Sequence, residues 1–492
     1  MATVSYTPND PLASGGPPTR STAVQNYPPG DIAKFDVQPT ATPGKYDPHT
    51  PEFQFWQAKL ALIGGLRAWK QVDGKYLRRW FGDQAQLQVW TDAGDDLNAF
   101  YDRASLQFFS HTYNGVTVNS AESVDVVTHE QGHAFLDAIR PDFFDVPFIE
   151  VGALHEAFGD CTAVLCAFED KAIRDAVIKS TPDLSGNHFA EALAEALGDA
   201  IAREYGQSNV EVGALRHALN NFSWADPTTL PSNAPADQLS GEVHSFARVF
   251  SGAFYDTIRN IYNSGKRNQT ALRKASRTAG QLLVAAIRTV PAAPNTFAAV
   301  GQRMLQADVV HNGGTNVQAI RDAFASHGMT LAAPVTSLAE PMAKPGQAAA
   351  KTELRRRLAV PAGTKVEVTP VESGMHDDIA HVSAYRPLSL DEAGLKGVRV
   401  MVPGVARVKT TRGGRSITGV VGEVSPAQGD ADSQARAFAR SLLASGDIKV
   451  APRATRRLGA APQPTVDRGA RKPTHEIRIV GGEPTLKRVG FR

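Results

Sequence analysis

The sequence predicts an α+β protein in several parts, and three observations along its 492 residues support this class. Residues 53–140 mix helical spacing of apolar side chains with short alternating stretches, which predicts a small mixed α/β unit. Residues 141–332 have helical spacing almost throughout. A linker rich in Ala, Pro and Gly follows over 333–351, and residues 352–450 alternate again around one amphipathic helix, which predicts a small α+β module.

Composition excludes several classes of protein. With 42% hydrophobic residues, 21% charged residues and a net charge of +2, the chain has no global field that favours nucleic acid or membranes. No apolar run approaches the roughly 18 residues that a membrane helix needs. Cys161 and Cys166, five apart in one predicted helix, suit neither a disulfide nor a zinc site. The N-terminus lacks the features of a Sec signal peptide, so we expect a cytoplasmic location, with export by a non-Sec route as the alternative.

The N-terminal segment, residues 1–52, holds ten of the 31 prolines and few large apolar residues. This composition cannot bury a core, so we expect a disordered leader. An inhibitory segment lying over the rest of the protein is the alternative interpretation.

Short strands and helices are expected in order after this leader. Helical spacing occupies 53–63 and 66–69, and alternation predicts strands at 86–90, 98–101 and 106–109. Further helices are expected at 189–201, 246–262 and 281–288. The module is expected to have strands at 365–369, 398–402 and 416–421 and a helix at 432–443.

The tail, residues 451–492, has ten Lys or Arg residues against three Asp or Glu residues, a local charge of +7. Such a tail can touch nucleic acid, but a solvated extension is the favoured interpretation, so nucleic acid is an unlikely partner.

The chemistry-bearing stretch is a His-Glu-x-x-His pattern at His129, Glu130 and His133. Residues four apart share one helix face, so the two imidazoles can bind one zinc ion with Glu130 beside them as a base. Asn119 is expected to cap this helix and Pro141 to end it. Two solvated histidines are the alternative interpretation of the pattern.

A third zinc ligand is expected on the following helix. Glu156 completes a two-His, one-Glu set that leaves a fourth position open for water, and Glu150 and His155 are rival ligands. Asp160, four residues after Glu156, can accept the spare N–H of a ligand imidazole, which fixes its tautomer.

The order of motifs resembles the thermolysin-like zinc metallopeptidases, or gluzincins. Residues 125–133 read Asp-Val-Val-Thr-His-Glu-Gln-Gly-His, and residues 152–160 read Gly-Ala-Leu-His-Glu-Ala-Phe-Gly-Asp. Asn-Ala-Phe-Tyr at 98–101, Leu-Arg at 215–216 and Gly-Glu-Val-His-Ser-Phe at 241–246 also resemble family motifs. The resemblance implies a two-lobed zincin catalytic domain, with a small β-containing lobe over 53–140 and a helical lobe after it.

The resemblance also implies an activity, the hydrolysis of internal bonds in protein or peptide substrates with one Zn²⁺ per chain. His129, His133 and Glu156 would hold the zinc, and Glu130 would be the general base. The remaining roles implied are oxyanion stabilisation by His244 and Arg216, binding of the substrate backbone by Asn98 and Ala99, and an apolar pocket at Leu215.

Three departures from the family pattern affect these expectations. The loop 140–148 has phenylalanines and no tyrosine, so oxyanion stabilisation would depend more on His244. Leu239 stands where the family has the Asp that orients this histidine, and Asp237 is only an approximate substitute. Ala167 stands where the family has a calcium-binding Glu, so structural calcium is doubtful even though Asp125 is present.

Two alternatives to an active peptidase follow from these departures. One is a catalytically weak zinc-binding scaffold for the C-terminal module. The other is a peptidase that its termini hold latent.

Overall fold

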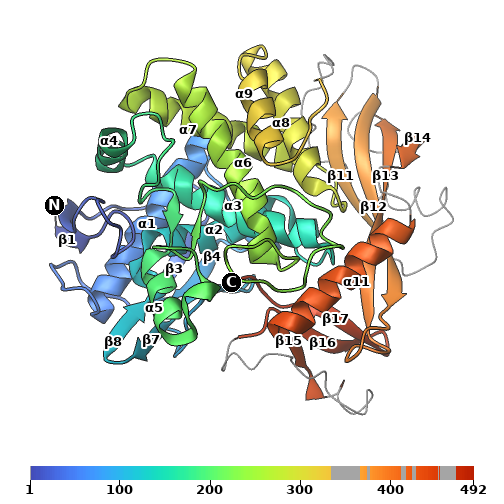
Figure 1. Ribbon diagram of the computed structural model, residues 1–492, viewed down its shortest axis with the longest axis horizontal. Helices are drawn as coiled ribbons and strands as arrows, with labels where there is room; N and C mark the ends of the chain where they lie inside the picture. Colours follow the sequence, from blue (N-terminus) through green and yellow to red (C-terminus); the bar gives the residue numbers. More distant parts are fainter. Residues whose placement is uncertain are drawn as a thin grey trace.

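The computed structural model describes residues 2–333, 366–373, 377–411, 417–423, 428–452, 454 and 472–492. Helix accounts for 43% and strand for 21% of it, which confirms the α+β class. Figure 1 shows the N-terminal strands and helices at one end, the long helices in the middle and the C-terminal sheet at the other end. Nearly all of the expected linker 333–351 lies outside the described residues.

The prediction of a disordered leader is wrong, because residues 2–52 belong to the folded core. β1 (Thr3–Tyr6) pairs with β2 (Arg20–Ala23), and β3 (Lys34–Gln38) joins the main N-terminal sheet. Phe35 and Val37 alternate with polar neighbours and are buried. The prolines lie outside these strands, so the overall composition concealed a short alternating strand.

The N-terminal sheet has the strand order β3-β4-β6-β5. Its other members are β4 (Gln86–Trp90), β5 (Ala99–Tyr101) and β6 (Ser105–Phe108), close to the predicted strands. β3, β4 and β6 run parallel to one another, whereas β5 is antiparallel to β6. The strand order places β5 at one edge of the sheet. α1 (Pro51–Asp73) covers β3 of this sheet, and β7 (Ser110–Tyr113) and β8 (Val116–Asn119) form a hairpin beyond it.

The two helices that carry the predicted site cross at glycines. α2 (Val124–Ile139) ends before Pro141 as expected, but Ser123 caps it, while Asn119 caps the preceding short turn. α3 (Ile149–Ala167) packs against α2. A Cβ atom on Gly132 would lie 2.8 Å from the Cα atom of Gly159, so only glycine allows this close approach.

Helices form most of the chain from residue 149 to residue 326. After α3 come α4 (Lys171–Ser180), α5 (Glu195–Tyr205), α6 (Val243–Asn263), α7 (Gln269–Ile287), α8 (Thr296–Asn312) and α9 (Val317–Ser326). The predicted helix 189–201 is partly wrong, since residues 192–193 form strand β9 (Ala192–Leu193), paired with β10 (Arg216–His217), before α5 begins. Among the described residues no single helix is long and apolar enough to cross a membrane, whereas α3 and α4, bent by 95° at their junction, pass that test only together.

The C-terminal module extends beyond its predicted end at residue 450. Its sheet has the order β11-β12-β13-β17-β16-β15, with β14 also paired to β13. The strands are β11 (Val366–Ser373), β12 (Asp377–Ser389), β13 (Arg399–Thr411), β14 (Ile417–Glu423), β15 (Ile448–Val450), β16 (His475–Val480) and β17 (Glu483–Arg488). Helix α11 (Gln428–Ser445) packs on this sheet.

The prediction of a solvated basic tail is therefore wrong for residues 472–492. β16 and β17 pair with each other in the module sheet, and Ile477, Leu486 and Phe491 are buried. Residues 455–471 lie outside the described part of the chain. The charges of the tail concealed the alternation of apolar side chains in these two strands.

Candidate active site

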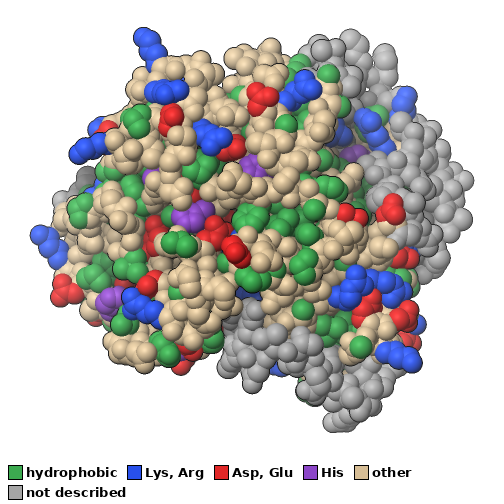
Figure 2. Space-filling view, viewed as in Figure 1, with side chains coloured by type: hydrophobic (Ala, Val, Ile, Leu, Met, Phe, Trp, Pro, Cys, Tyr) green, Lys and Arg blue, Asp and Glu red, His purple; other side chains and the backbone are tan. Residues whose placement is uncertain are grey.

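A cavity of about 460 Å³ lies between the edge strand β5, helix α2 and the segments around α5, β10 and α6. The predicted residues Asn98, Ala99, Leu215, Arg216 and His244 all line it, together with His129 and Glu130. In the space-filling view, acidic and histidine side chains gather near the middle of the described surface, among hydrophobic ones (Figure 2).

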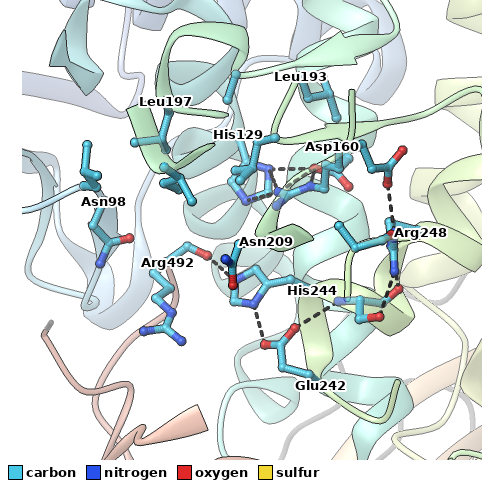
Figure 3. Close-up of a pocket in the computed structure, with 18 of the residues that line it drawn as sticks. Asn98, His129, Asp160, Leu193, Leu197, Asn209, Glu242, His244, Arg248 and Arg492 are labelled. Carbon is cyan, nitrogen blue, oxygen red and sulfur yellow. Dashed lines mark hydrogen bonds and ion pairs between the residues drawn. The ribbon is translucent and has the colours of Figure 1, made fainter. Parts of the chain in front are cut away.

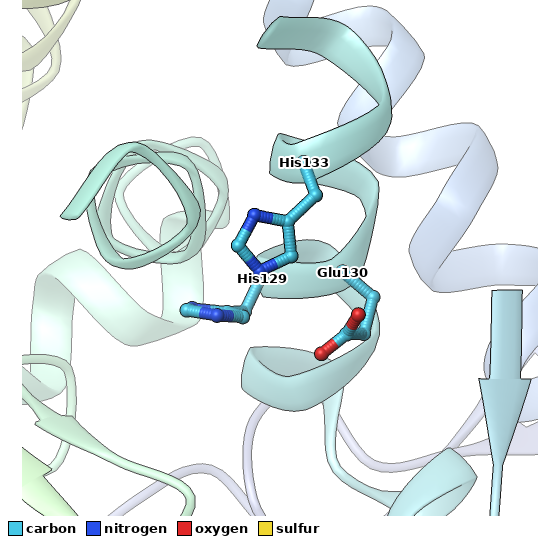
Figure 4. Close-up of side chains that lie close together, drawn as sticks. All are labelled: His129, Glu130 and His133. Atoms are coloured by element: carbon cyan, nitrogen blue, oxygen red, sulfur yellow. The ribbon is translucent and has the colours of Figure 1, made fainter. Parts of the chain in front are cut away.

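Helix α2 presents the His-Glu-x-x-His side chains on one face (Figure 4). Nε2 of His129 lies 3.5 Å from Oε2 of Glu156, and Nε2 of His133 lies 3.6 Å from the same oxygen. Three atoms bound to one tetrahedral zinc ion at about 2.0–2.1 Å lie about 3.3–3.4 Å apart. The predicted ligands therefore converge with nearly the spacing that zinc requires.

Two of the three donor atoms also lack hydrogen-bond partners, while Nε2 of His129 lies 3.4 Å from Nη2 of Arg216. Nε2 of His133 and Oε2 of Glu156 are buried and accept or donate no hydrogen bond. Buried polar atoms are almost always paired, so unpaired ones call for an explanation. Two imidazole nitrogens and one carboxylate oxygen are the donor set of many catalytic zinc sites, so these residues fit zinc.

The two rival ligands have other contacts. Glu150 accepts hydrogen bonds from Nε1 of Trp224 and the backbone N of Phe297, both at 2.8 Å. Nδ1 of His155 lies 3.0 Å from Nδ1 of His133. His155 therefore orients His133 and leaves Nε2 of His133 free, while Glu150 stabilises the helical part of the protein.

Asp160 links three groups around His129. Its Oδ1 atom lies 3.0 Å from Nδ1 of His129, as the sequence predicts, and accepts a hydrogen bond from Nε of Arg216 at 2.9 Å. Its Oδ2 atom accepts a hydrogen bond from Ser251 at 2.8 Å, a partner that the sequence did not indicate. Burial raises the pKa of Asp160, but the Arg216 and His129 charges lower it more, and the net pKa is below its usual range.

Glu242 orients His244, so the expectation that Asp237 approximately fills this role is wrong. Nδ1 of His244 lies 2.6 Å from Oε1 of Glu242 (Figure 3). Its Nε2 atom lies 3.3 Å from Oε2 of Glu156. Glu242 also caps α6 through the backbone N of Ser245. Burial lowers the pKa of His244, yet Glu156 and Glu242 raise it to a net value above the usual one, which favours an imidazolium that donates from both nitrogens.

Glu130 and the edge strand complete the cavity. Burial raises the pKa of Glu130 to about 8, and a divalent cation beside it would favour the ionised form. The Oε2 atom of Glu130 and the Nδ2 atom of Asn98 are buried without hydrogen-bond partners, so both are available to groups that enter the cavity.

The strand that carries Arg216 is held by an ion pair. Nδ1 of His217 lies 3.0 Å from Oε1 of Glu191, and Nε2 of His217 donates to the carbonyl of Val212. Burial lowers the pKa of His217, but Glu191 raises it to a net value of about 9.

We expect this ion pair to stabilise the protein only below alkaline pH. The stabilisation is fully present below the unfolded pKa of 6.5 and disappears as the pH rises through about 9. His217→Gln should therefore lower the free energy of unfolding by about 1–3 kcal/mol at pH 6 and by much less at pH 10. Urea denaturation at both values measures this, with the exposed His311→Gln as control. An equal loss at the two pH values would contradict the ion-pair explanation.

A second group of possible metal ligands lies beside the cavity, which one of its members, Asp125, helps to line. Asp10, Asp125 and Glu195 place carboxylate oxygens within 4.8 Å of one another, and all three are buried. One oxygen of Asp10, one of Asp125 and both of Glu195 have no hydrogen-bond partner. Burial and the neighbouring carboxylates raise the pKa of Glu195 to about 11. The three groups must bind a cation or carry protons, since three buried negative charges repel one another.

We expect calcium to stabilise the folded protein through this group, because calcium prefers carboxylate oxygens. At a concentration of about 100 times the dissociation constant, the gain is about 2.7 kcal/mol. Differential scanning fluorimetry with and without millimolar calcium should show a rise in Tm for the wild type and a smaller rise for Asp10→Asn. If calcium changes neither Tm and Asp10→Asn alone raises it, the carboxylates share protons instead.

Comparison with known proteins adds no family assignment. No protein-family model matches the sequence, and no curated protein matches it.

Proposed function

We propose that the chain is a zinc-dependent endopeptidase of the thermolysin-like type, acting on internal bonds of proteins or peptides. The observation that carries the proposal is the convergence of Nε2 of His129, Nε2 of His133 and Oε2 of Glu156, with Glu130 beside them. The two-lobed thermolysin-like architecture belongs to the same proposal, with the cavity lying between the two lobes.

In this mechanism the protein supplies a base, Glu130, and a positively charged donor, His244, to the same cavity. Zinc held by His129, His133 and Glu156 would lower the pKa of a water molecule from about 15.7 toward about 7. Glu130 takes the proton as water attacks and delivers it to the leaving nitrogen. His244 donates from Nε2 to the oxygen that becomes negative, and removing one such donor typically costs about 3 kcal/mol.

Arg216 has two effects in this arrangement. Its guanidinium holds Asp160 and lies 3.4 Å from Nε2 of His129, so it adds positive charge beside the ligand set. Asn98 and Ala99, at the β5 edge of the N-terminal sheet, would bind the substrate backbone as an added strand, and Leu215 would contribute to an apolar pocket.

A catalytically weak zinc-binding scaffold is the second candidate function. The loop after α2 presents Phe143 and Phe144, both buried, where a hydroxyl donor would assist the oxyanion. His244 and Arg216 alone would then stabilise the negative charge.

The test is zinc content measured together with casein hydrolysis. We expect one zinc per chain, with hydrolysis that a chelator abolishes and added zinc restores. One zinc without hydrolysis would favour the scaffold. Absence of zinc in protein prepared with zinc present would contradict both candidates.

A further inference from the structure

We infer that residues 489–492 are a substrate-like occupant of the candidate active site and hold it closed. The site itself would then take an extended peptide with an aromatic side chain at the second residue before the bond that is cut. This inference rests on the proposed function for the place of the cut, but the occupation of the cleft is independent of it.

The backbone of this segment adds a strand to the edge of the N-terminal sheet. The backbone N of Phe491 donates to the carbonyl of Tyr101 at 2.8 Å, and the backbone N of Tyr101 donates to the carbonyl of Phe491 at 2.9 Å. This antiparallel pairing extends β5 on the side that does not contact β6. It is the mode in which a sheet edge binds an extended peptide.

The side chain of Phe491 fills an aromatic pocket beside the predicted zinc ligands. Its ring stacks on His155 with the centroids 3.7 Å apart and lies 5.0 Å from the ring of His133. Phe144 contacts it edge-on at 5.4 Å, and the guanidinium of Arg488 lies over it at 4.0 Å. The ring is fully buried, so the pocket suits an aromatic side chain.

The next residue brings a carbonyl to the oxyanion donor. The carbonyl oxygen of Arg492 lies 2.8 Å from Nε2 of His244 (Figure 3). The Arg492 guanidinium donates to Oδ2 of Asp447 in the C-terminal module. Because His244 is the proposed stabiliser of the negative oxygen, Arg492 occupies the place of the residue whose carbonyl would be attacked. A substrate cannot pair with Tyr101 or reach His244 while the segment stays there.

Gly490 makes the close approach to β5 possible and offers a way to disturb it. A Cβ atom on residue 490 would lie 2.3 Å from the ring of Phe100 and 2.5 Å from the carbonyl oxygen of Tyr101. The backbone oxygen cannot move without disrupting β5, so alanine at this position should expel the segment. Gly265 is a matched control, because a Cβ atom there would meet nothing within 4 Å.

The experiment uses the full chain and a labelled peptide, Thr-Leu-Lys-Arg-Val-Gly-Phe-Arg, the sequence of residues 485–492. Binding is measured by fluorescence anisotropy in the Glu130→Gln background, in which the proposed base is absent. We expect Gly490→Ala to bind the peptide at least about tenfold more tightly than the background or Gly265→Ala, because an internal competitor at high effective concentration has left. The same peptide with alanine in place of its phenylalanine should bind more weakly.

Casein hydrolysis without the Glu130→Gln change is the second readout. Gly490→Ala should raise the rate at least about tenfold, whereas Gly265→Ala should leave it unchanged. Phe491→Ala, which empties the pocket without pressing on β5, should act in the same direction and guards against a folding defect of Gly490→Ala.

The two readouts separate the inference from the proposed function. Tighter peptide binding without hydrolysis in any variant supports the occupied cleft and contradicts the peptidase. Equal peptide binding in all backgrounds, with folded variants, overturns the inference even if the wild type hydrolyses casein.

Discussion

Replacing Glu130 with glutamine should reduce casein hydrolysis by about 10²- to 10⁴-fold while the zinc content stays at one per chain. The amide keeps the shape of the carboxylate but cannot take a proton from water. Glu130 is buried beside His129, and its Oε2 atom has no hydrogen-bond partner, so the substitution breaks no contact of that oxygen.

This prediction is tested by three measurements on each protein. They are the rate at saturating casein, the zinc content by mass spectrometry, and Tm. Glu52→Gln, an exposed change in the first turn of α1, is the matched control and should leave all three unchanged. Activity within about threefold of the wild type in Glu130→Gln would exclude Glu130 as the base. Loss of zinc in this variant would instead place Glu130 among the ligands.

Replacing Asp160 with alanine should destabilise the protein by about 3–5 kcal/mol and weaken zinc binding by about 10- to 100-fold. The loss of stability follows from Arg216, a nearly buried guanidinium whose closest carboxylate partner is Asp160 at 2.8 Å. The loss of affinity follows from His129, whose ring orientation depends on the bond from its Nδ1 atom to Asp160.

Urea denaturation and competition with a zinc-sensitive dye measure these two effects. Ser251→Ala is the matched control, because it removes the hydroxyl that contacts Oδ2 of Asp160 and the carbonyl of Ala247 but leaves Arg216 and His129 paired with Asp160, and it should cost about 1 kcal/mol with unchanged zinc affinity. If both variants lose the same stability and affinity, Asp160 does not act through Arg216 and His129.

The local spacing of residues was enough to predict the arrangement within each helix. His129 and His133 share one face of α2, and Glu156 and Asp160 share one face of α3, because a helix repeats every 3.6 residues. The strands at 86–90 and near 98–101 were predicted from alternation in the same way. Contacts between residues four or fewer positions apart depend on the local helix or strand geometry, so the sequence is enough to predict them.

Alternatives within a motif were not resolved in this way. Spacing left Glu150 and His155 as rivals of Glu156, since all three belong to one helix. Hydrogen bonds from Trp224 and Phe297 hold Glu150 away from the cavity. The contact of His155 with His133 makes His155 a residue that orients a predicted ligand. Glu242, only two residues from His244, was overlooked because the family pattern directed attention to an earlier position.

The sequence by itself determined which side chains can act as zinc ligands and base, and which helix face carries them. Only the tertiary structure decided that Asp10 joins Asp125 and Glu195, and that Arg492 meets His244, 248 residues away in the chain. Local periodicity contains no information on which distant segments meet. Those contacts follow from how the helices and sheets bury their apolar faces together, here with Phe491 in the same core as helix α2.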